Sequence, residues 1–303
     1  MNIVSFRDVS VERDGRFLLK NLNLDISSGV ITVVLGSEES GLNTMVNLLA
    51  GLERQGVGDI SIYGLNIFTD SAEVNRQTGF VLRDSELYEA FSASENIQFY
   101  ADLYGMEEKE TYERMAELMR RLSLWKQRDT DYGRLSSSDK IKLRLVRALI
   151  HSPSLLIVDD VLKSLDNESL REVSQLFSYL ISEEKMSILI FTDNPDYSFG
   201  ADEYVIMING SAAVSGPYAA LQQAAHLKSR AVIQTLDGTL NLPAYEVSDT
   251  GNGVFEILIE DKREICEIIK SAVLFNNSIT GAGVIDRTLS ELYSALLERR
   301  MLE

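Results

Sequence analysis

Two glycines, Gly36 and Gly41, bound a loop that joins an apolar, strand-like run to a helical pattern. Their spacing matches the phosphate-loop pattern G-x-x-x-x-G-K-[ST], whose backbone N–H groups cradle phosphates while the lysine reaches the β- and γ-phosphates and the hydroxyl holds Mg²⁺. In this chain Leu42 stands at the lysine position and Asn43 at the hydroxyl position, with Thr44 next. The loop therefore has the glycine frame for phosphate binding without the side chains that make the contacts.

The charge of this loop opposes a bound polyanion. The loop lacks the ammonium group of the pattern's lysine, and it carries two added carboxylates, Glu38 and Glu39. At an effective dielectric constant near 20 and a separation of about 6 Å, each charge pair is worth roughly 3 kcal/mol. Losing one attraction and adding one repulsion costs about 3–6 kcal/mol, or roughly two to four powers of ten in affinity. We therefore predict that this loop binds ATP weakly or not at all, and that its glycines serve as hinges of a tight turn.

A second group of candidate residues lies where another apolar run, residues 155–158, ends in Asp159 and Asp160. An apolar strand that ends in carboxylates has the form of a Walker B segment. Just upstream, the segment Leu135-Ser136-Ser137-Ser138-Asp139 opens a basic helical pattern that continues to residue 150. Open parallel sheets place ligands where buried strands end and helices begin, so the glycine loop and these carboxylates both stand where chemistry is expected.

The elements that position these residues alternate between strand and helix over residues 1–227. Short, continuously apolar runs predict strands, and apolar residues at helical spacing predict helices. The predicted strands are residues 30–35, 60–63, 79–82, 155–158, 188–191 and 204–208, and the predicted helices are 43–52, 96–104, 109–122, 140–150 and 170–182. Apolar strands separated by helices indicate an α/β fold with a mostly parallel sheet that is buried on both faces.

The sequence changes in character beyond a helix and linker at about residues 217–231. Strand-like alternation and two amphipathic helical patterns predict a small α+β domain there. The strands are expected at 231–240, 254–259 and 280–285, and the helices at 263–273 and 289–300. We therefore divide the chain into domains at 1–227 and 228–303. Cys266, the single cysteine, lies at helical spacing and is expected to be buried.

Composition excludes several classes of protein. A chain of 303 residues that is 45% apolar and 25% charged is typical of a soluble protein with two domains. Its net charge of −17 repels phosphate backbones and anionic lipids, so we expect no nucleic-acid partner and no direct insertion into lipid. One cysteine and two histidines leave no cysteine- or multi-histidine metal site, and we predict no bound metal. The longest apolar runs are strand-sized and the N-terminus shows no targeting pattern, so we expect a soluble, unprocessed chain.

The order of these motifs resembles that of the ATP-binding subunit of an ABC transporter. In that family a signature helix, which opens with L-S-G-G-Q and ends with A-R-A-L, precedes Walker B, as residues 135–150 precede residues 155–160 here. The segment Ser164-Leu165-Asp166 resembles the family's D-loop, and the tail is similar to that of drug- and haem-export-type subunits. The resemblance implies a P-loop NTPase-like ABC ATPase domain with a mostly parallel core sheet and a helical subdomain at about 84–150, followed by the small α+β domain.

Compared with the family pattern, most functional positions are substituted. Asp159 fits the metal-associated aspartate of Walker B, whereas Asp160 stands in place of the catalytic glutamate. Arg83 replaces the glutamine expected after the strand at 79–82, and Asp193 replaces the switch histidine. We predict that these four residues are vestigial catalytic positions. The vestigial nucleotide-binding positions are Gly36, Gly41, Leu42, Asn43 and Thr44.

Part of the signature loop is retained. In the family, two subunits close face to face, and each signature loop caps the ATP held by the other subunit. Ser136 keeps the serine that donates to the γ-phosphate, whereas Asp139 adds a repulsive charge. The residues that the resemblance places against a partner's ATP are Leu135, Ser136, Ser137, Ser138 and Asp139. ATP and Mg²⁺ would then belong to the partner's site, and we expect no cofactor at the chain's own site.

The resemblance implies a catalytically degenerate nucleotide-binding subunit with a structural or regulatory role. It would bind peripherally at the cytoplasmic face of the cell membrane and contact transmembrane ABC subunits through residues 83–104 and the helical block. It would pair with an active ATPase homologue as a heterodimer. Two alternatives stay open. One is an active ABC ATPase with unorthodox chemistry that drives export, which needs a lysine delivered from elsewhere. The other is a soluble regulatory ABC protein with no role in transport.

Overall fold

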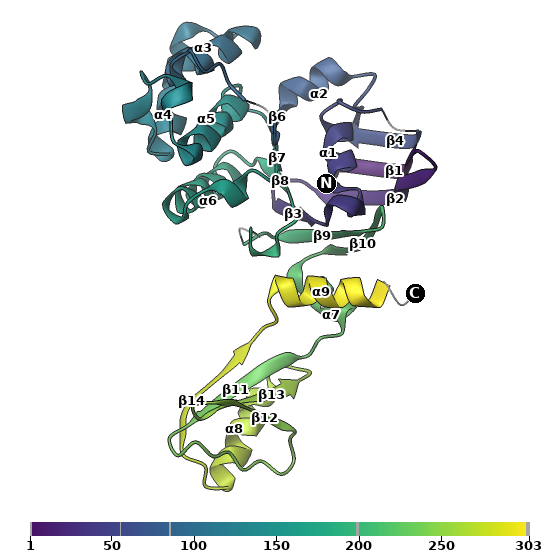
Figure 1. Cartoon of the computed structure of the whole chain (residues 1–303), viewed down its shortest axis with the longest axis vertical. Helices are drawn as coiled ribbons and strands as arrows, with labels where there is room; N and C mark the ends of the chain where they lie inside the picture. The colour runs from purple at the N-terminus through teal and green to yellow at the C-terminus, as the bar shows by residue number, and fades with distance from the viewer. Residues whose placement is uncertain (1, 55, 85, 198–199, 301–303) are drawn as a thin grey trace. The chain divides into compact units, whose positions relative to one another are not determined.

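The computed structural model describes residues 2–54, 56–84, 86–197 and 200–300. The chain divides into two compact units, Met1–Tyr218 and Ala219–Glu303 (Figure 1). Helix α7 (Tyr218–Ala225) is bonded within the second unit, where Gln222 Nε2 donates to Ser229 Oγ at 2.7 Å. The division therefore falls before the body of α7, whereas the sequence suggested a boundary after residue 227.

A six-stranded sheet forms the centre of the first unit. Its order is β10-β9-β3-β8-β7-β6, and every neighbouring pair except the antiparallel β10–β9 pair is parallel. The strands are β3 (Ile31–Leu35), β6 (Thr78–Val81), β7 (Leu155–Asp159), β8 (Ser187–Thr192), β9 (Glu203–Ile208) and β10 (Ser211–Gly216). All residues of β3, β7 and β8 are buried, because these strands are covered on both faces. The predicted α/β fold with a mostly parallel sheet is confirmed.

A second, antiparallel sheet of the first unit has the order β2-β1-β4-β5. Its strands are β1 (Asn2–Arg13), β2 (Arg16–Ser27), β4 (Val57–Ile62) and β5 (Leu65–Asn66). Phe6, Leu22 and Ile60 from this sheet lie in the same buried apolar cluster as Val34 of β3 and Met45 of helix α1 (Leu42–Leu49). One core therefore joins the two sheets and fixes α1 between them. Helix α2 (Ser71–Gln77) follows and leads into β6.

The helical block of the first unit consists of α3 (Ala93–Leu103), α4 (Glu108–Arg121) and α5 (Ser137–Leu149), which lie together away from β1, β2 and β4 (Figure 1). Helix α3 begins with a capping box in which Ser92 and Glu95 bond to each other's backbone N–H groups. Helix α6 (Asn167–Ser182) follows β7. The short 3₁₀ turns are η1 (Glu38–Ser40), η2 (Trp125–Gln127), η3 (Tyr132–Arg134), η4 (Leu162–Ser164) and η5 (Pro195–Tyr197). Within the described residues, no helix combines the length and apolarity needed to cross a bilayer.

The second unit is a four-stranded antiparallel sheet with helices. Its order is β12-β13-β11-β14, and the bounds are β11 (Ser229–Thr235), β12 (Val247–Gly251), β13 (Val254–Ile259), β14 (Ile279–Ile285), α8 (Glu264–Leu274) and α9 (Leu289–Arg300). Ile233, Ile257 and Ile268 are buried in one small core between the sheet and α8. This is the small α+β fold that the sequence predicted.

Cys266 is exposed, so the expectation that it is buried was wrong. Helix α8 turns Ile268 and Ala272 toward the sheet. At about 100° per residue, Cys266 lies about 200° around the helix from Ile268 and so points away from the core.

Candidate functional site

The glycine loop joins β3 to α1 through the turn η1. A Cβ atom at Gly36 would overlap Ser40 Oγ, and one at Gly41 would overlap the backbone oxygen of Leu18. Gly41 also has a φ of 90°, which favours glycine. Ser40 is buried, and its hydroxyl donates to Ser37 O at 2.6 Å. Both glycines are therefore required by the close packing of this turn against its neighbours.

The side chains of the loop divide into a buried and an exposed set. Leu42 is 2% exposed and belongs to the main apolar core, and Thr44 is also buried. Glu38 and Glu39 are exposed. Glu39 lies 3.6 Å from Arg16, and because both side chains are mostly exposed this ion pair contributes little. The residue at the lysine position thus points into the protein, and the solvent side of the loop presents carboxylates.

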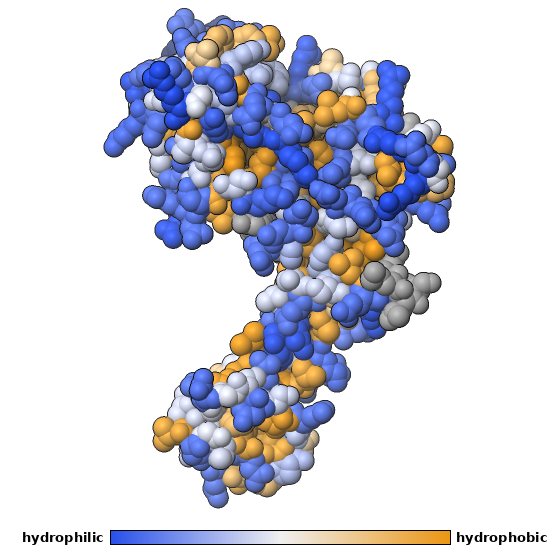
Figure 2. All heavy atoms as spheres, viewed as in Figure 1, coloured by the Kyte–Doolittle hydropathy of each residue, from blue (hydrophilic) through white to orange (hydrophobic). Residues whose placement is uncertain are grey.

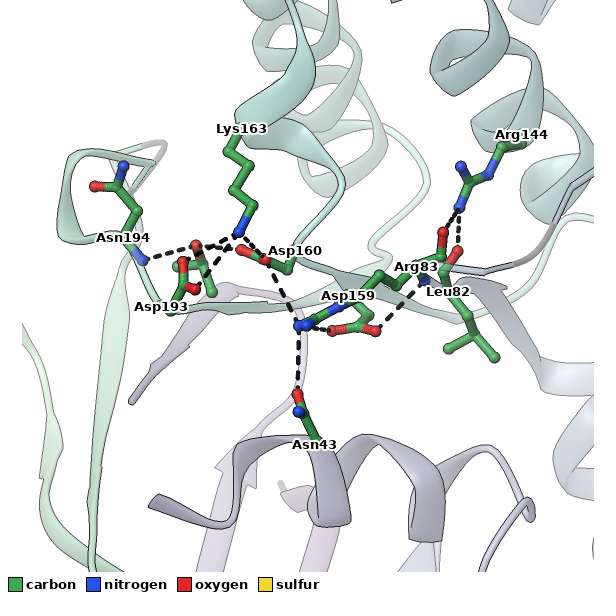
Figure 3. Close-up of polar contacts among 10 residues, drawn as sticks. Asn43, Leu82, Arg83, Arg144, Asp159, Asp160, Lys163, Asp193 and Asn194 are labelled. Carbon is green, nitrogen blue, oxygen red and sulfur yellow. Dashed lines mark hydrogen bonds and ion pairs between the residues drawn. The ribbon is translucent and has the colours of Figure 1, made fainter. Parts of the chain in front are cut away.

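The two carboxylates after the Walker B-like strand are buried at the end of β7. Asp160 is held by the neighbouring strand β8, because its Oδ1 accepts a hydrogen bond from Thr192 Oγ1 at 3.1 Å and its backbone N–H donates to Phe191 O at 2.8 Å. Asp160 has a φ of 49°, which is uncommon for residues other than glycine. Asp159, one residue earlier, faces the segment that follows β6 (Figure 3). The adjacent carboxylates therefore need compensating charge.

Arg83 provides compensating charge and connects the carboxylates to the glycine loop (Figure 3). Its Nη2 atom donates to Asp159 Oδ1 at 3.2 Å and to Asn43 Oδ1 at 3.3 Å, and lies 3.6 Å from Asp160 Oδ2. The backbone N–H of Arg83 also donates to Asp159 Oδ2 at 3.4 Å. A single side chain, at the position where the family pattern has glutamine, thus joins the end of β7 to the exposed side of α1.

Lys163 is a second cation at these carboxylates, and the sequence analysis did not single it out. It lies in η4 and forms an ion pair with Asp160, and its Nζ atom is 3.4 Å from Asp193 Oδ1 (Figure 3). Its spacing from Asp160 was the available signal, because a tight helical turn brings residues i and i+3 together. We call Arg83, Lys163, Asp159, Asp160 and Asp193 the carboxylate cluster. It contains two cations and three acids.

Arg144 holds the segment that carries Arg83. This buried residue of α5 donates through Nη2 to the backbone oxygens of Leu82 and Arg83, the latter at 3.2 Å (Figure 3). It also lies 3.5 Å from Glu86. The helical block therefore fixes the chain just after β6. No local sequence pattern points to this contact, because it depends on how α5 packs against β6.

The pKa directions in the cluster follow from its burial and pairing. Burial alone would lower the pKa of Arg83. The negative charges of Asp159 and Asp160, together with the hydrogen bond to Asp159, outweigh the effect of burial and raise the pKa above its ordinary value. The hydrogen bond to Asp160 raises the pKa of Lys163, and burial opposes this only in part. Burial raises the pKa of Asp159, and Arg83 counteracts this incompletely. The cations are therefore held in their charged forms by the carboxylates.

Ser136 begins helix α5 and is bonded within the chain. Its Oγ accepts a hydrogen bond from Asp139 N at 3.1 Å, and its hydroxyl donates to Asp139 Oδ2 at 2.8 Å. Asp139 pairs with the buried Lys142 at 2.9 Å, and Lys142 also lies 3.1 Å from Glu172. The charge of Asp139 is thus compensated locally, which the sequence analysis did not anticipate.

The other signature residues lie around this contact. Leu135 is buried and Ser137 is exposed. Ser138 Oγ donates to Asp166 Oδ2 at 2.6 Å, and Asp166 caps helix α6. The structure therefore links the signature segment to the segment that resembles the D-loop.

Comparison with known proteins gives a consistent result. Residues 19–163 match a family model described as ABC transporter. The lipoprotein-releasing system ATP-binding protein of Chromohalobacter salexigens is 28% identical over 199 residues, which cover 64% of this chain and 84% of that protein. A putative ABC transporter ATP-binding protein of Pyrococcus horikoshii is 26% identical over 290 residues, which cover 92% of this chain and 100% of that protein.

Solved structures show the same fold. The structure of an ATP-binding subunit of an ABC transporter has a TM-score of 0.66 at 22% identity, over 73% of this chain and 92% of that chain. An ATP-binding cassette solved as a dimer in a post-hydrolysis state, bound to ADP and Pi, has a TM-score of 0.63 at 22% identity, over 71% and 98%. With the family match, the fold and the order of the segments in agreement, residues 19–163 form an ABC transporter ATP-binding domain.

Proposed function

We propose that this chain is a catalytically degenerate ATP-binding-domain subunit of an ABC transporter, with a structural or regulatory role in the complex. The observation that carries the proposal is the ion pairing of the carboxylate cluster. Arg83 contacts both Asp159 and Asp160, and Lys163 contacts Asp160 and Asp193. The chain's own side chains thus supply the positive charge that these acids require.

The residues of the cluster do not fit Mg²⁺ with a bound triphosphate. Mg²⁺ requires oxygen ligands in a near-octahedral arrangement. Asp159 instead accepts hydrogen bonds from both the backbone and the side chain of Arg83, so an entering ion would have to displace the guanidinium. A triphosphate would also meet the exposed Glu38 and Glu39, and the residue at the lysine position, Leu42, is in the core. These features all oppose nucleotide binding at this site.

Lys163 does not favour the alternative of an unorthodox active ATPase. That alternative needs a lysine that reaches a nucleotide phosphate from elsewhere in the chain. Lys163 approaches the cluster, but its ammonium group is engaged with Asp160 and Asp193. A lysine held by two carboxylates is a poor donor to a phosphate, because moving it would leave the buried Asp160 undercompensated.

The proposed partners follow from the family. ABC ATPase domains work with transmembrane subunits and dimerise, and relatives are named for lipoprotein release, macrolide export and bacitracin transport. We therefore place this chain peripherally at the cytoplasmic face of a membrane, in a drug-export-type complex. Its counterpart in the dimer would be an active homologue that supplies the hydrolytic residues.

The signature segment is the part that could act on the counterpart's ATP. Ser136 stands at the N-terminus of α5, where backbone N–H groups favour an anion. Its hydroxyl would have to exchange Asp139 for a phosphate oxygen. Lys142 reduces the repulsion between Asp139 and that phosphate, because it neutralises the carboxylate. The pairing role is thus compatible with the charge of the segment.

Equilibrium dialysis with labelled ATP and Mg²⁺ tests the degenerate site directly. The purified chain should show no saturable binding at micromolar ATP, whereas an intact ABC ATP-binding protein dialysed in parallel should bind. A micromolar Kd for the chain would overturn the proposal. A matched variant, R83Q/K163S, separates the causes, because it removes both cations but leaves Leu42 and the glutamates. We expect this variant to remain unable to bind ATP.

A further inference from the structure

The end of helix α4 and the turn η2 carry a local excess of positive charge. Residues 114–128 contain five cations and one carboxylate, a net charge of +4 in a chain whose net charge is −17. Helix α4 lies on the far side of the helical block from β6 (Figure 1). Figure 2 shows hydrophilic residues over most of the visible face of the first unit. A segment whose sign opposes that of the whole chain creates a local field that attracts anions.

Two arginines of this segment stack on one indole. The Arg120 Cζ atom lies 4.7 Å and the Arg128 Cζ atom 5.0 Å from the centroid of the Trp125 ring, and Tyr112 meets the same ring edge-on at 5.9 Å. Arg128 Nη1 also donates to Trp125 O at 3.1 Å. Cation–π contacts of this kind hold a guanidinium group against an aromatic ring. We call Tyr112, Arg120, Trp125, Lys126 and Arg128 the basic patch.

The positive charge of the basic patch is only partly neutralised by the chain. Arg120 and Lys126 are exposed, and neither forms an ion pair with any residue that the structure describes. Arg128 pairs with Asp129 at 3.1 Å, but the two side chains are 39% and 73% exposed, so this pair contributes little. Arg121, next to Arg120, has instead a carboxylate partner in its own helix at 3.1 Å. The patch therefore presents cations to solvent, whereas the adjacent arginine is paired within the chain.

The two guanidinium groups of the patch are suited to carboxylates. A guanidinium presents a planar fork of N–H donors, which can bind a carboxylate through two parallel hydrogen bonds. Stacking on Trp125 restricts both arginines before a ligand arrives, so less conformational entropy is lost on binding. A ligand that fits must place several carboxylates close together. Acidic residues three or four positions apart on a helix have such a spacing.

We propose that the basic patch binds an acidic segment of a partner protein, whose carboxylates pair with Arg120, Lys126 and Arg128. This binding is independent of the proposed function, because none of these residues belongs to the carboxylate cluster or to the signature segment. The cytoplasmic loops of a membrane-spanning subunit are not this partner, since such loops carry an excess of lysine and arginine, which the patch repels.

Charge and symmetry disfavour the other occupants of the patch. An anionic bilayer or a nucleic acid presents an extended array of negative charge, which would also meet the negative remainder of the chain. A short acidic segment needs to contact the patch alone. A second copy that placed its own acidic residues on the patch would make a heterologous contact, which builds open chains of subunits.

Fluorescence anisotropy with the full chain tests the charge preference. Two labelled, alanine-based peptides of about 14 residues, or roughly four helical turns, carry either glutamate or glutamine at positions three and four apart. The glutamate peptide should bind although the chain has a net charge of −17, the glutamine peptide should not, and binding should weaken as salt is raised. R120Q/K126Q should weaken binding by about three- to ten-fold, because two exposed charge contacts are lost. Equal binding of the two peptides would overturn the inference.

Matched variants distinguish the basic patch from the overall charge of the chain. K20Q/K270Q removes the same charge from two exposed positions outside the patch and should change the affinity by less than about two-fold. W125L keeps every charge but removes the stacking, so it should weaken binding by about two- to five-fold, with a thermal melt to monitor folding. R120Q/K126Q and K20Q/K270Q replace exposed residues, so they decide the outcome even where W125L is less stable. Equal effects of these two double variants would contradict the assignment of the patch.

Further measurements address the occupants that charge disfavours. Wild type and R120Q/K126Q are mixed with phosphatidylserine-containing vesicles and with labelled single-stranded DNA, and self-association is followed by sedimentation. Binding or self-association that R120Q/K126Q abolishes, without binding of the glutamate peptide, would assign the patch to that occupant and overturn the inference. Micromolar ATP binding in the dialysis experiment would overturn the proposed function but leave the acidic partner standing, because the basic patch takes no part in nucleotide binding.

Discussion

The carboxylate cluster and the acidic segment at residues 84–110 lie in the same unit but differ in how many cations accompany their carboxylates. In the cluster, Arg83 and Lys163 compensate three acids within the chain. Residues 84–110 contain eight carboxylates and one lysine. Arg83 stands directly before the acidic segment, so the two regions adjoin in the sequence.

Under the proposed function, this difference separates a site that binds no nucleotide from a surface whose charge is available to a partner. A site that supplies its own counter-charge gains nothing from a ligand, since the ligand must first displace an existing ion pair. A surface with an excess of one charge gains from a complementary partner through attraction and steering.

The largest expected effect comes from removing the compensation at the cluster. R83M leaves Asp159 and Asp160 adjacent, with Lys163 as the cation that remains in contact with Asp160. Breaking a buried ion pair costs about 3–5 kcal/mol, and because the Arg83 side chain is 35% exposed we expect a loss of about 2–4 kcal/mol in the free energy of unfolding. Urea denaturation of R83M and the wild type at neutral pH measures this loss.

The matched control for this change is R76M. Arg76 forms an exposed ion pair with Glu73 at 3.5 Å, so its removal should cost about 0.5 kcal/mol or less. If R83M were no more destabilised than R76M, the claim that the cluster depends on internal compensation would be wrong.

Much of this architecture could be predicted from local sequence. Strand β13 and helix α9 were predicted with the bounds that the structure has, because one is a short apolar run and the other an amphipathic pattern. Strands β1 and β2 are harder to recognise, since their pairing contains several bulges that interrupt regular alternation.

The site was predictable only where its chemistry is local. The glycine spacing and the paired Asp159 and Asp160 could be read directly from the chain. The contacts of Arg144 with the Arg83 backbone and of Lys163 with Asp193 join residues that are distant in sequence, so they depend on tertiary packing. The substitution at Arg83 was recognised from the family pattern, but the direction in which its side chain points was not.

His151, a partly buried base that stacks on Tyr104, provides a test by pH. Burial, with a smaller contribution from Arg147, lowers the pKa of His151 to about 4. Between pH 6.5 and 4, His151 binds a proton in the unfolded chain but stays mostly neutral in the folded chain. Acidification therefore favours the unfolded chain: the stability that neutral His151 allows is complete above pH 6.5 and is lost as pH falls toward 4. Between pH 7 and pH 4, the free energy of unfolding of the wild type should fall by about 2–3 kcal/mol more than that of H151F.

Chemical denaturation of the two proteins across this pH range isolates His151, because the carboxylates titrate in both. Phenylalanine keeps a ring to stack on Tyr104. Parallel pH profiles for the two proteins would show that His151 is not held neutral by burial.

A smaller effect is expected from the second cation of the cluster. K163M removes the ion pairs with Asp160 and Asp193, but Asp160 keeps its contact with Arg83 and its hydrogen bond from Thr192. Because Lys163 is 40% exposed, we expect a loss of about 1–2 kcal/mol in urea denaturation. K109M, which removes an exposed lysine from the acidic segment, should differ from wild type by about 0.5 kcal/mol or less. A larger loss from K163M than from R83M would reverse the assigned order of the two cations.

The smallest effect on stability separates the two roles of Ser136. S136A removes the cap of helix α5 and should cost about 1 kcal/mol, whereas S136N keeps an N-cap side chain and should stay within about 0.5 kcal/mol of wild type. Neither variant has the hydroxyl that would reach a counterpart's phosphate. If Ser136 acts on that ATP, both variants lower the ATPase turnover of the reconstituted complex, although only S136A weakens the helix. Full turnover with S136N would instead confine Ser136 to capping, and the signature segment would then be, like the carboxylate cluster, a site whose polar groups are satisfied by the chain itself.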